Sequence, residues 1–435
     1  MPAQRPASRL GGDAGGLQTV TALDLGVSKV FCIIARASAD DFGVRKARVL
    51  GVGSAMSRGI KLGGVADMEA AEASVRAALD QAEATAQVSV SRAAVVYSGP
   101  RLRSRRVRAE VGVTGREIAT RDIRRALDEG LASAQESGFA VLHAIPLSYA
   151  VDGADGVRDP RRMIGARLGV DLLAVSAPLA PLRQIALLME RCHLELAAMA
   201  SAPYLSGLSS LTDDEVQLGV TLVDMGAGAT AAAVFEDGVL RGVEAAPLGG
   251  RHVSNDLARA LAAPPAAAER IKTLYASVLD SPDDDREMID YERIGEDGAL
   301  EPASTARSLL VSVARPRLEE TFELIRDRLA EIGDKAGVAR PVVLTGGASR
   351  LNGARELAQR VFGRPVRLGR ALRPAPLSAF EPGPGAEAAA GLVRHMLETT
   401  REARFGPPDL SDAPGPKTAP PGAMGRALAW LRENF

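Results

Sequence analysis

The chain has 435 residues, with 53 Lys and Arg against 54 Asp and Glu, and a net charge of -1. That length favours two or more compact lobes, and the balanced charge gives no overall case for binding nucleic acid. The two cysteines, Cys32 and Cys192, lie in apolar segments without metal-ligand or disulfide spacing. We expect them to be small core residues in a reducing compartment.

The first eighteen residues are rich in Gly, Arg, Pro and Ala and lack the apolar core of a signal peptide. They are therefore predicted to be a disordered tail. No run approaches the ~18 apolar residues that a membrane-spanning helix requires. The sequence predicts a cytosolic protein, unless a peripheral element tethers it.

A glycine turn follows the first predicted strand. Asp24 lies at the end of that strand, Gly26, Ser28 and Lys29 form the turn, and residues 31–34 form a second strand. Backbone N–H groups in such a turn can face phosphate oxygens, while the carboxylate holds the water shell of a cation. A plain β-hairpin is the simpler interpretation of this motif alone.

The rest of the first half predicts an α/β unit followed by an insertion. A strand at 47–54 and a helix at 68–86, with Asp67 as N-cap, complete the α/β unit. Residues 93–176 differ in sequence pattern from the preceding residues and predict an inserted αβ subdomain. Its elements are a strand at 95–99, a basic run at 101–108, a helix from Thr120 to 137, and apolar segments at 141–146 and 166–174. The arginines either bind an acidic partner or lie on a solvated strand and turn.

The second half repeats the order of the first. After a helix at 179–193, a second turn carries Asp224, Gly226, Gly228 and Thr230. Strands at 222–224, 231–235 and 239–246 and a helix at 253–261 surround it. Strand, glycine turn, strand, strand and helix therefore occur twice, which indicates an internal duplication.

The remaining elements end in a third glycine signal. A short helix at 267–272, an acidic loop at 280–290 and a long helix at 304–332 come first, with Pro316 as a kink or a boundary between two helices. A buried strand then ends at Gly346 and Gly347, directly before a helix at 351–361. Backbone N–H groups and the positive end of a helix dipole at such a junction can face a ligand.

Two Asp-x-Gly turns in a duplicated fold and a late Thr-Gly-Gly-Ala turn resemble the actin, Hsp70 and sugar-kinase superfamily. The resemblance implies two actin-like (ribonuclease H-like) lobes around a cleft that binds ATP and Mg²⁺. It matches Asp24, Gly26, Ser28 and Lys29 to the first phosphate loop, Asp224, Gly226, Gly228 and Thr230 to the second, Gly346 and Gly347 to the adenosine loop, and Glu269 and Lys272 to the ribose and purine pair. Asp24 and Asp224 would hold the metal through water. A surface ion pair is the alternative for Glu269 and Lys272.

Several short sequence motifs narrow the resemblance to the FtsA family, the bacterial cell-division actin homologues. These motifs are residues 51–54, 57–60, 63–65, 143–146 and 342–348, and the resemblance covers about residues 21–391. It implies that the insert is the 1C subdomain, used for self-association and for contacts with later division proteins. Two departures are Ala227, which restricts the second loop and can alter nucleotide affinity, and the acidic stretch 280–297.

The end of the chain predicts a tethered membrane helix. Residues 401–423 are rich in Pro and Gly and predict a disordered linker. The last twelve residues predict an amphipathic helix that binds a membrane surface. At about 1.5 Å per residue it is too short to span a bilayer. Its anchoring side chains are Met424, Leu428, Trp430, Leu431 and Phe435.

The predicted organisation has seven parts. They are a tail (1–18), the first part of lobe 1 (19–92), the insert (93–176), a return to lobe 1 (177–214), lobe 2 with the adenosine loop (215–400), the linker (401–423) and the targeting helix (424–435).

The resemblance implies an ATP-binding, self-associating adaptor rather than an enzyme, with weak ATP hydrolysis at most. It implies that the protein tethers FtsZ polymers to the inner face of the cytoplasmic membrane at the division septum. The acidic FtsZ tail would bind near the helix at 304–332, where Arg307, Arg315 and Arg317 are candidate partners or ordinary solvated arginines. An actin-like adaptor of pilus assembly is the alternative. A sugar kinase would need a carboxylate base that we do not identify, and an Hsp70-like chaperone would need a substrate-binding domain.

Overall fold

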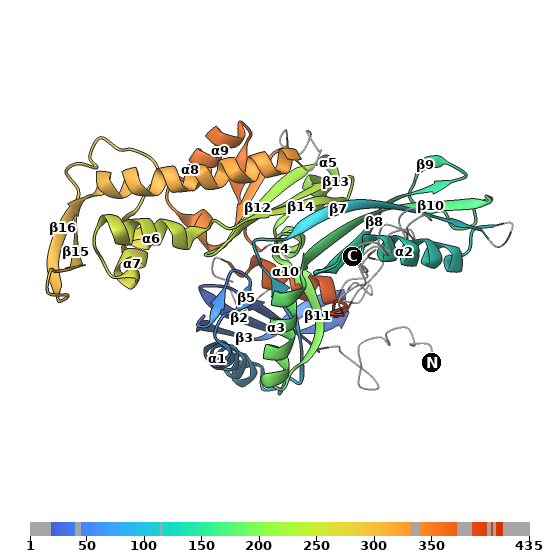
Figure 1. Ribbon diagram of the computed structural model, residues 1–435, viewed down its shortest axis with the longest axis horizontal. Coiled ribbons are helices and arrows are strands. Elements are labelled where there is room, and N and C mark those ends of the chain that lie inside the picture. Colours follow the sequence, from blue (N-terminus) through green and yellow to red (C-terminus); the bar gives the residue numbers. More distant parts are fainter. Residues whose placement is uncertain are drawn as a thin grey trace, which may run out of the picture.

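Two sheets with the same internal strand order form the frame of the protein. The computed structural model describes residues 19–39, 45–113, 115, 117–331, 340–371, 385–397, 402 and 406–411. The predicted tail, most of the linker and the targeting helix lie outside these residues. Figure 1 shows lobe 1 in the lower half of the view, lobe 2 above it, and the insert extending to the right.

The lobe 1 sheet is an antiparallel meander extended by two parallel strands. Its order is β11-β6-β1-β2-β3 within the described residues. The strands are β1 (Thr19–Leu25), β2 (Lys29–Ala39), β3 (Arg45–Met56), β6 (Arg92–Tyr97) and β11 (Glu195–Ser201). A small hairpin, β4 (Ile60–Lys61) with β5 (Gly64–Val65), follows β3.

The lobe 2 sheet repeats this arrangement. Its strands are β12 (Val220–Met225), β13 (Thr230–Glu236), β14 (Val239–Ala246), β17 (Val342–Thr345) and β18 (Val366–Leu368). The order β18-β17-β12-β13-β14 mirrors that of lobe 1, with β17 parallel to β12 as β6 is to β1. The predicted duplication is therefore confirmed.

Alternating side chains of β1 bury both faces of the lobe 1 sheet. Leu23 and Leu25 pack with α1 (Met68–Ala86) and α3 (Leu179–Arg191). Val20 and Ala22 pack with α4 (Ala202–Ser210) and α10 (Glu387–Leu397) on the other face. Asp67 accepts a hydrogen bond from the Ala70 N–H at 3.1 Å and caps α1 as predicted.

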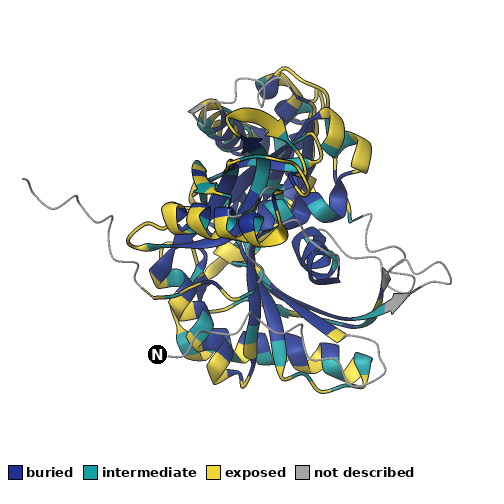
Figure 2. Ribbon diagram, turned by 90° about the vertical axis from the view of Figure 1, so that its right-hand side faces the viewer, coloured by how far each residue is buried: buried dark blue, intermediate teal, exposed yellow. Residues whose placement is uncertain are grey.

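The helices of lobe 2 cover one face of its sheet. They are α6 (Gly250–Ala260), α7 (Pro265–Tyr275), α8 (Arg307–Glu331) and α9 (Ala354–Phe362). A short helix α5 (Asp213–Leu218) precedes the sheet, and a 3-10 helix η2 (Gly347–Arg350) follows β17. Figure 2 shows buried residues on the strands and inner helix faces, with exposed residues turned outward.

The insert extends the lobe 2 sheet. It contains β7 (Arg103–Gly112), α2 (Thr120–Ala134), β8 (Phe139–Val151), β9 (Ala154–Val157) and β10 (Arg167–Pro178). Arg103 pairs with Glu244 of β14, and the Ser104 hydroxyl exchanges two hydrogen bonds with the Val243 backbone. The insert is thus attached by backbone pairing to lobe 2.

Five sequence expectations need correction. The strand expected at the start of the insert is β6, a central strand of lobe 1, because it pairs with β1. Helix α10 falls within the range assigned to lobe 2 (215–400) but packs on lobe 1. Helix α8 continues through Pro316, so the proline is not a boundary between two helices. Residues 288–306 form an unexpected hairpin, β15 (Met288–Ile294) with β16 (Leu300–Ala306), and η2 separates β17 from α9.

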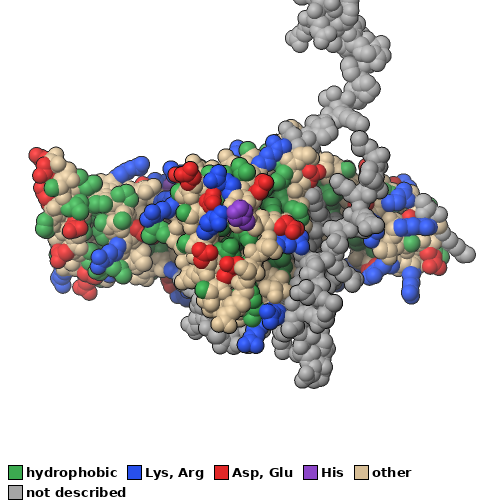
Figure 3. Space-filling view, turned by 90° about the horizontal axis from the view of Figure 1, so that it is seen from below, with side chains coloured by type: hydrophobic (Ala, Val, Ile, Leu, Met, Phe, Trp, Pro, Cys, Tyr) green, Lys and Arg blue, Asp and Glu red, His purple; other side chains and the backbone are tan. Residues whose placement is uncertain are grey.

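Other features agree with the sequence. Cys32 and Cys192 are free and buried, as expected of core residues. No helix in the described part of the chain is long and apolar enough to cross a membrane. In Figure 3, basic and acidic side chains are interspersed over the lower face. The basic run falls mainly on β7, where Arg103 forms an ion pair with Glu136 and stacks over the Phe139 ring.

A cavity between the two lobes

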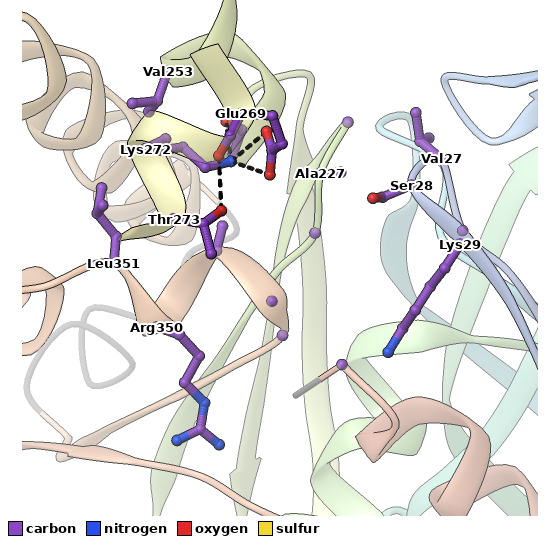
Figure 4. A pocket seen from close by; sticks show the side chains of 18 of the residues that line it. Val27, Ser28, Lys29, Ala227, Val253, Glu269, Lys272, Thr273, Arg350 and Leu351 are labelled. Carbon is purple, nitrogen blue, oxygen red and sulfur yellow. Dashed lines mark hydrogen bonds and ion pairs between the residues drawn. The ribbon is translucent and has the colours of Figure 1, made fainter. Parts of the chain in front are cut away.

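A cavity of about 550 Å³ lies where the two Asp-x-Gly turns meet. All but one of the predicted nucleotide-site residues line it: Asp24, Gly26, Ser28, Lys29, Asp224, Gly226, Gly228, Glu269, Lys272, Gly346 and Gly347. Figure 4 shows Val27, Ser28 and Lys29 on one side and Lys272, Arg350 and Leu351 on the other. Its size is typical of a small-molecule site.

The first loop requires a glycine and touches lobe 2. A Cβ at Gly26 would lie 2.7 Å from the Lys29 carbonyl oxygen, so a larger residue would push the turn open. The Val27 carbonyl accepts a hydrogen bond from the Arg251 guanidinium of α6 at 2.6 Å. Arg251 therefore joins the two lobes beside the first loop.

The second loop is closed by backbone hydrogen bonds. Gly226 N–H donates to Ala229 at 2.9 Å, and Gly250 and Arg251 N–H groups donate to Gly226 and Ala227 at 3.0 and 2.9 Å. A Cβ at Gly228 would lie 2.8 Å from Val27, so the two phosphate-type loops approach each other directly. The start of α6 supports this loop, and Ala227 is accommodated in it.

Thr230 is the predicted site residue that does not line the cavity. It is fully buried in β13 opposite Met225. Its hydroxyl has no hydrogen-bond partner among the described residues. The spacing from Gly228 therefore carries the threonine into the strand and away from the loop.

The third loop lies over Asp224. Gly346 adopts a φ of 82°, and a Cβ there would lie 2.6 Å from Asp224 Oδ1. Both conditions require glycine. On the same side of the cavity as this loop, Lys272 Nζ lies 2.9 and 2.8 Å from the two oxygens of Glu269 and donates to the Gly250 carbonyl at 3.2 Å. The pair thus forms part of the cavity wall (Figure 4).

Asp24 and Asp224 carry perturbed pKa values. Burial and the neighbouring Asp224 raise the pKa of Asp24 to about 7, against a partial lowering by Lys29. Burial raises the pKa of Asp224 to about 6, while the Ser206 hydroxyl, 2.6 Å from Oδ2, lowers it. Facing carboxylates with oxygen-only donors fit a hydrated divalent cation such as Mg²⁺.

Sequence reasoning missed several residues at or beside this cavity, three of which bear on its function. These three are Ser206 of α4, Arg251 of α6 and Glu387 of α10. Ser206 and Glu387 come from alanine- and serine-rich helices without a motif. Arg251 directly follows the Gly249–Gly250 pair at the start of a helix, and this glycine pair is the sequence signal that could have indicated its role.

A second polar cluster is buried beside α4. His143 Nδ1 lies 3.2 Å from Glu402 Oε2, His395 Nε2 lies 3.4 Å from Glu402 Oε1, and His143 Nε2 accepts the Ser201 N–H at 2.8 Å. That acceptor role places the His143 proton on Nδ1, where it faces the carboxylate. His143 therefore cannot offer Nδ1 to a metal, and the cluster is a buried hydrogen-bond network.

The three predicted FtsZ-binding arginines all have acidic partners within the chain. Arg307 lies 3.3 Å from Asp284 and 3.0 Å from Glu287, Arg315 lies 2.6 Å from Asp280, and Arg317 lies 2.6 Å from Asp256. The acidic stretch that had no assigned role therefore supplies partners for Arg307 and Arg315. Asp280 is largely exposed, whereas Asp284 is buried.

Two family models match the chain. One described as "Cell division protein FtsA" matches residues 221–386, and one described as "SHS2 domain inserted in FTSA" matches residues 99–176. The second match begins just after β6 ends at Tyr97. The start of this match therefore agrees with the sheet topology, in which β6 belongs to lobe 1 and not to the insert.

Curated relatives match over nearly the full length. The cell division protein FtsA of Agrobacterium fabrum (strain C58) is 37% identical over 426 residues, which cover 96% of this chain and 95% of that protein. The cell division protein FtsA of Escherichia coli (strain K12) is 30% identical over 424 residues, covering 96% and 98%.

Solved structures share the fold at lower identity. A chain of a PilM-PilN type IV pilus biogenesis complex superimposes with a TM-score of 0.60 at 16% identity, covering 87% of this chain and 99% of that one. At this identity the likeness concerns the fold alone, so it does not favour the pilus alternative.

Proposed function

Because this chain belongs to the FtsA family of actin-like cell-division proteins, we propose that it binds ATP with Mg²⁺ between its lobes and tethers FtsZ polymers to the inner face of the cytoplasmic membrane. The observation that carries the nucleotide part is the meeting of two Asp-x-Gly loops and the Gly346 loop around one cavity. Mg²⁺ would neutralise phosphate charge there, with Asp24 and Asp224 as its carboxylate partners.

ATP acts in this proposal as a conformational ligand. Phosphates placed between the two loops would contact both lobes, and Arg251 already joins the lobes through the Val27 carbonyl. Bound nucleotide would favour the closed arrangement by its differential affinity for that state. We propose that this arrangement favours self-association, and that ATP hydrolysis is slow.

Membrane attachment is assigned to residues 424–435, which lie outside the described residues. A twelve-residue amphipathic helix buries only a few apolar side chains, so a single copy binds weakly. A filament that presents many copies raises the avidity without any new contact. A weak anchor and a polymer are therefore complementary parts of one tether, and binding to FtsZ would bring that tether to the septum.

Reconstitution on vesicles tests this function. With MgATP and anionic vesicles, the full chain should co-sediment FtsZ, and deletion of residues 424–435 should reduce the bound FtsZ about tenfold or more. A chain with the same twelve residues in scrambled order, which lacks the apolar face, is the matched control and should behave like the deletion. Unchanged recruitment by either variant, or rapid ATP turnover that Asp224→Ala abolishes, would refute the proposal.

The proposed FtsZ contact can be tested at Arg315. Its partner Asp280 is exposed, so the arginine can exchange that carboxylate for one of an acidic peptide. Arg315→Glu should weaken binding of the FtsZ tail peptide several-fold at low salt, and Asp280→Asn should strengthen it by a smaller factor. Both effects should shrink as ionic strength rises.

Fluorescence anisotropy of a labelled tail peptide measures these affinities. Arg161→Glu, in an exposed ion pair with Asp159 on the insert, is the control for a general charge effect. Equal affinities for Arg315→Glu and the unchanged protein would place the peptide elsewhere. Arg307 is unsuitable for this test because its partner Asp284 is buried, and reversal would disturb the fold.

A further inference from the structure

Glu387 belongs to none of the three glycine loops of the proposed site. It is the first residue of α10, its side chain is 4% exposed, and it lines the cavity together with Asp24 and Asp224. A glutamate in the first turn of a helix is common, because it faces the positive end of the dipole. Burial in a cavity beside two other carboxylates is not explained by that preference.

One oxygen of the Glu387 carboxylate lacks a partner within the described part of the chain. The backbone N–H groups of Gly385 and Glu387 stabilise the carboxylate and oppose the rise in its pKa that burial causes. Oε2, however, has no hydrogen-bond partner among the residues the structure describes. A buried carboxylate oxygen without a partner is costly, so such an atom indicates a ligand.

The surroundings of Glu387 are rich in negative charge. Its carboxylate raises the pKa values of both Asp24 and Asp224, so the three groups interact through the cavity. Arg350 and Lys29 lower the pKa of Glu387, and Lys29 also lowers that of Asp24. A Cβ at Gly385 would lie 3.8 Å from Lys29 Nζ and 3.5 Å from the Gly347 nitrogen, so the start of α10 lies between the first and third loops.

Helix α4 holds the Asp224 carboxylate and the backbone of Glu387 in place. The Ser206 hydroxyl donates to Asp224 at 2.6 Å, and one turn later the Ser209 hydroxyl donates to the Glu387 carbonyl oxygen at 2.7 Å. Because both serines belong to one helix, the distance between Asp224 and the start of α10 is constrained. Such supporting hydrogen bonds are typical of residues that orient a metal site.

We propose that Glu387 supplies a third carboxylate to the divalent-cation site that accompanies the nucleotide. The proposal rests on the proposed nucleotide function and extends its cation partners beyond Asp24 and Asp224. As a consequence, cation binding and nucleotide binding should be strongly coupled. Without the cation, Glu387 repels the phosphates, and with the cation it strengthens their binding, so nucleotide affinity depends steeply on Mg²⁺.

Glu387→Gln separates these two effects because it keeps the shape of the side chain and removes its charge. The dissociation constant of a fluorescent ATP analogue is measured in EDTA and in saturating Mg²⁺. The ratio of the two constants should fall about tenfold in the variant, with binding in EDTA unchanged or tighter. Electron paramagnetic resonance of Mn²⁺ should show about tenfold weaker cation binding to the nucleotide complex of the variant.

Controls keep the outcomes distinct. Glu356→Gln on α9 removes a carboxylate that does not line the cavity and should leave the ratio unchanged. Glu387→Asp retains the charge and should keep part of the coupling between cation and nucleotide binding. This variant replaces Glu387→Gln in the test if circular dichroism shows that the Gln variant does not fold. An unchanged ratio and Mn²⁺ affinity in Glu387→Gln would overturn the inference alone. Failure of the unmodified protein to bind the analogue in Mg²⁺ would overturn the proposed function itself.

Discussion

Replacing Asp24 with Asn should make the metal-free protein more stable and should abolish its Mg²⁺-dependent ATP binding. Burial raises the pKa of Asp24 to about 7, with smaller contributions from the neighbouring Asp224 and Glu387. An ionised carboxylate there is destabilising until a cation neutralises it. Asparagine removes the charge and also the group that would face the cation, so stability and function change in opposite directions.

The pH dependence gives the sign of this effect. Between the ordinary aspartate pKa of 3.8 and about 7, folded Asp24 keeps a proton that the unfolded chain has lost. The unmodified protein therefore loses stability as pH rises through that interval, and the full loss is present above pH 7. A pKa shift across this interval corresponds to about 4 kcal/mol in the free energy of unfolding. At pH 8 we expect the free energies of unfolding of the two proteins to differ by about 2 kcal/mol. This is less than the full shift because coupled carboxylates adjust their protonation. Near pH 4 we expect no difference.

Urea unfolding in EDTA at pH 4.5, 6 and 8 measures this difference. Asp128→Asn, at an exposed position of α2, should change the free energy of unfolding by less than about 0.5 kcal/mol at each pH. Isothermal titration with MgATP gives the loss of binding. An Asp24→Asn protein that is less stable at pH 8, or that retains Mg²⁺-dependent binding, would show that Asp24 has a structural role.

Local signals explain the correct part of the sequence prediction. Asp67 and the apolar stripe behind it define α1 to the residue, since a capping carboxylate and a 3.6-residue period are properties of one segment. The Asp24 and Asp224 turns were recognised because strand, carboxylate and glycine lie within six residues. Their spatial approach followed from the duplication and not from either motif.

The errors concern partners that lie far away in the sequence. The apolar run of β6 does not encode that its neighbour is β1, so it was assigned to the insert. Arg317 gives no local sign that Asp256, 61 residues earlier, is its partner. Glu387 is an ordinary first-turn residue until α10 is seen to pack on lobe 1 and to place it in the cavity. Tertiary contacts decide each of these roles.

The contact between α10 and α4 is one of these tertiary contacts, and Gly391 determines how close it is. A Cβ at Gly391 would lie 1.8 Å from the carbonyl oxygen of Leu205, a backbone atom that cannot rotate away. Gly391→Ala should therefore destabilise the protein by about 3 kcal/mol or more through overpacking. Helix propensity alone predicts the opposite sign, a gain of about 1 kcal/mol for Gly→Ala inside a helix.

Gly130→Ala is a matched control, because Gly130 is also a buried glycine inside a helix. A Cβ there would lie 3.2 Å from the end of the Leu172 side chain, which can move slightly, so this variant should be neutral or more stable by up to about 1 kcal/mol. Denaturant unfolding compares the two. Gly391→Ala should also reduce the Mg²⁺ dependence of ATP binding, because a displaced α10 moves Glu387 away from Asp224. A stabilised Gly391→Ala protein would mean that α10 tolerates greater separation from α4, and that the position of Glu387 does not depend on this contact.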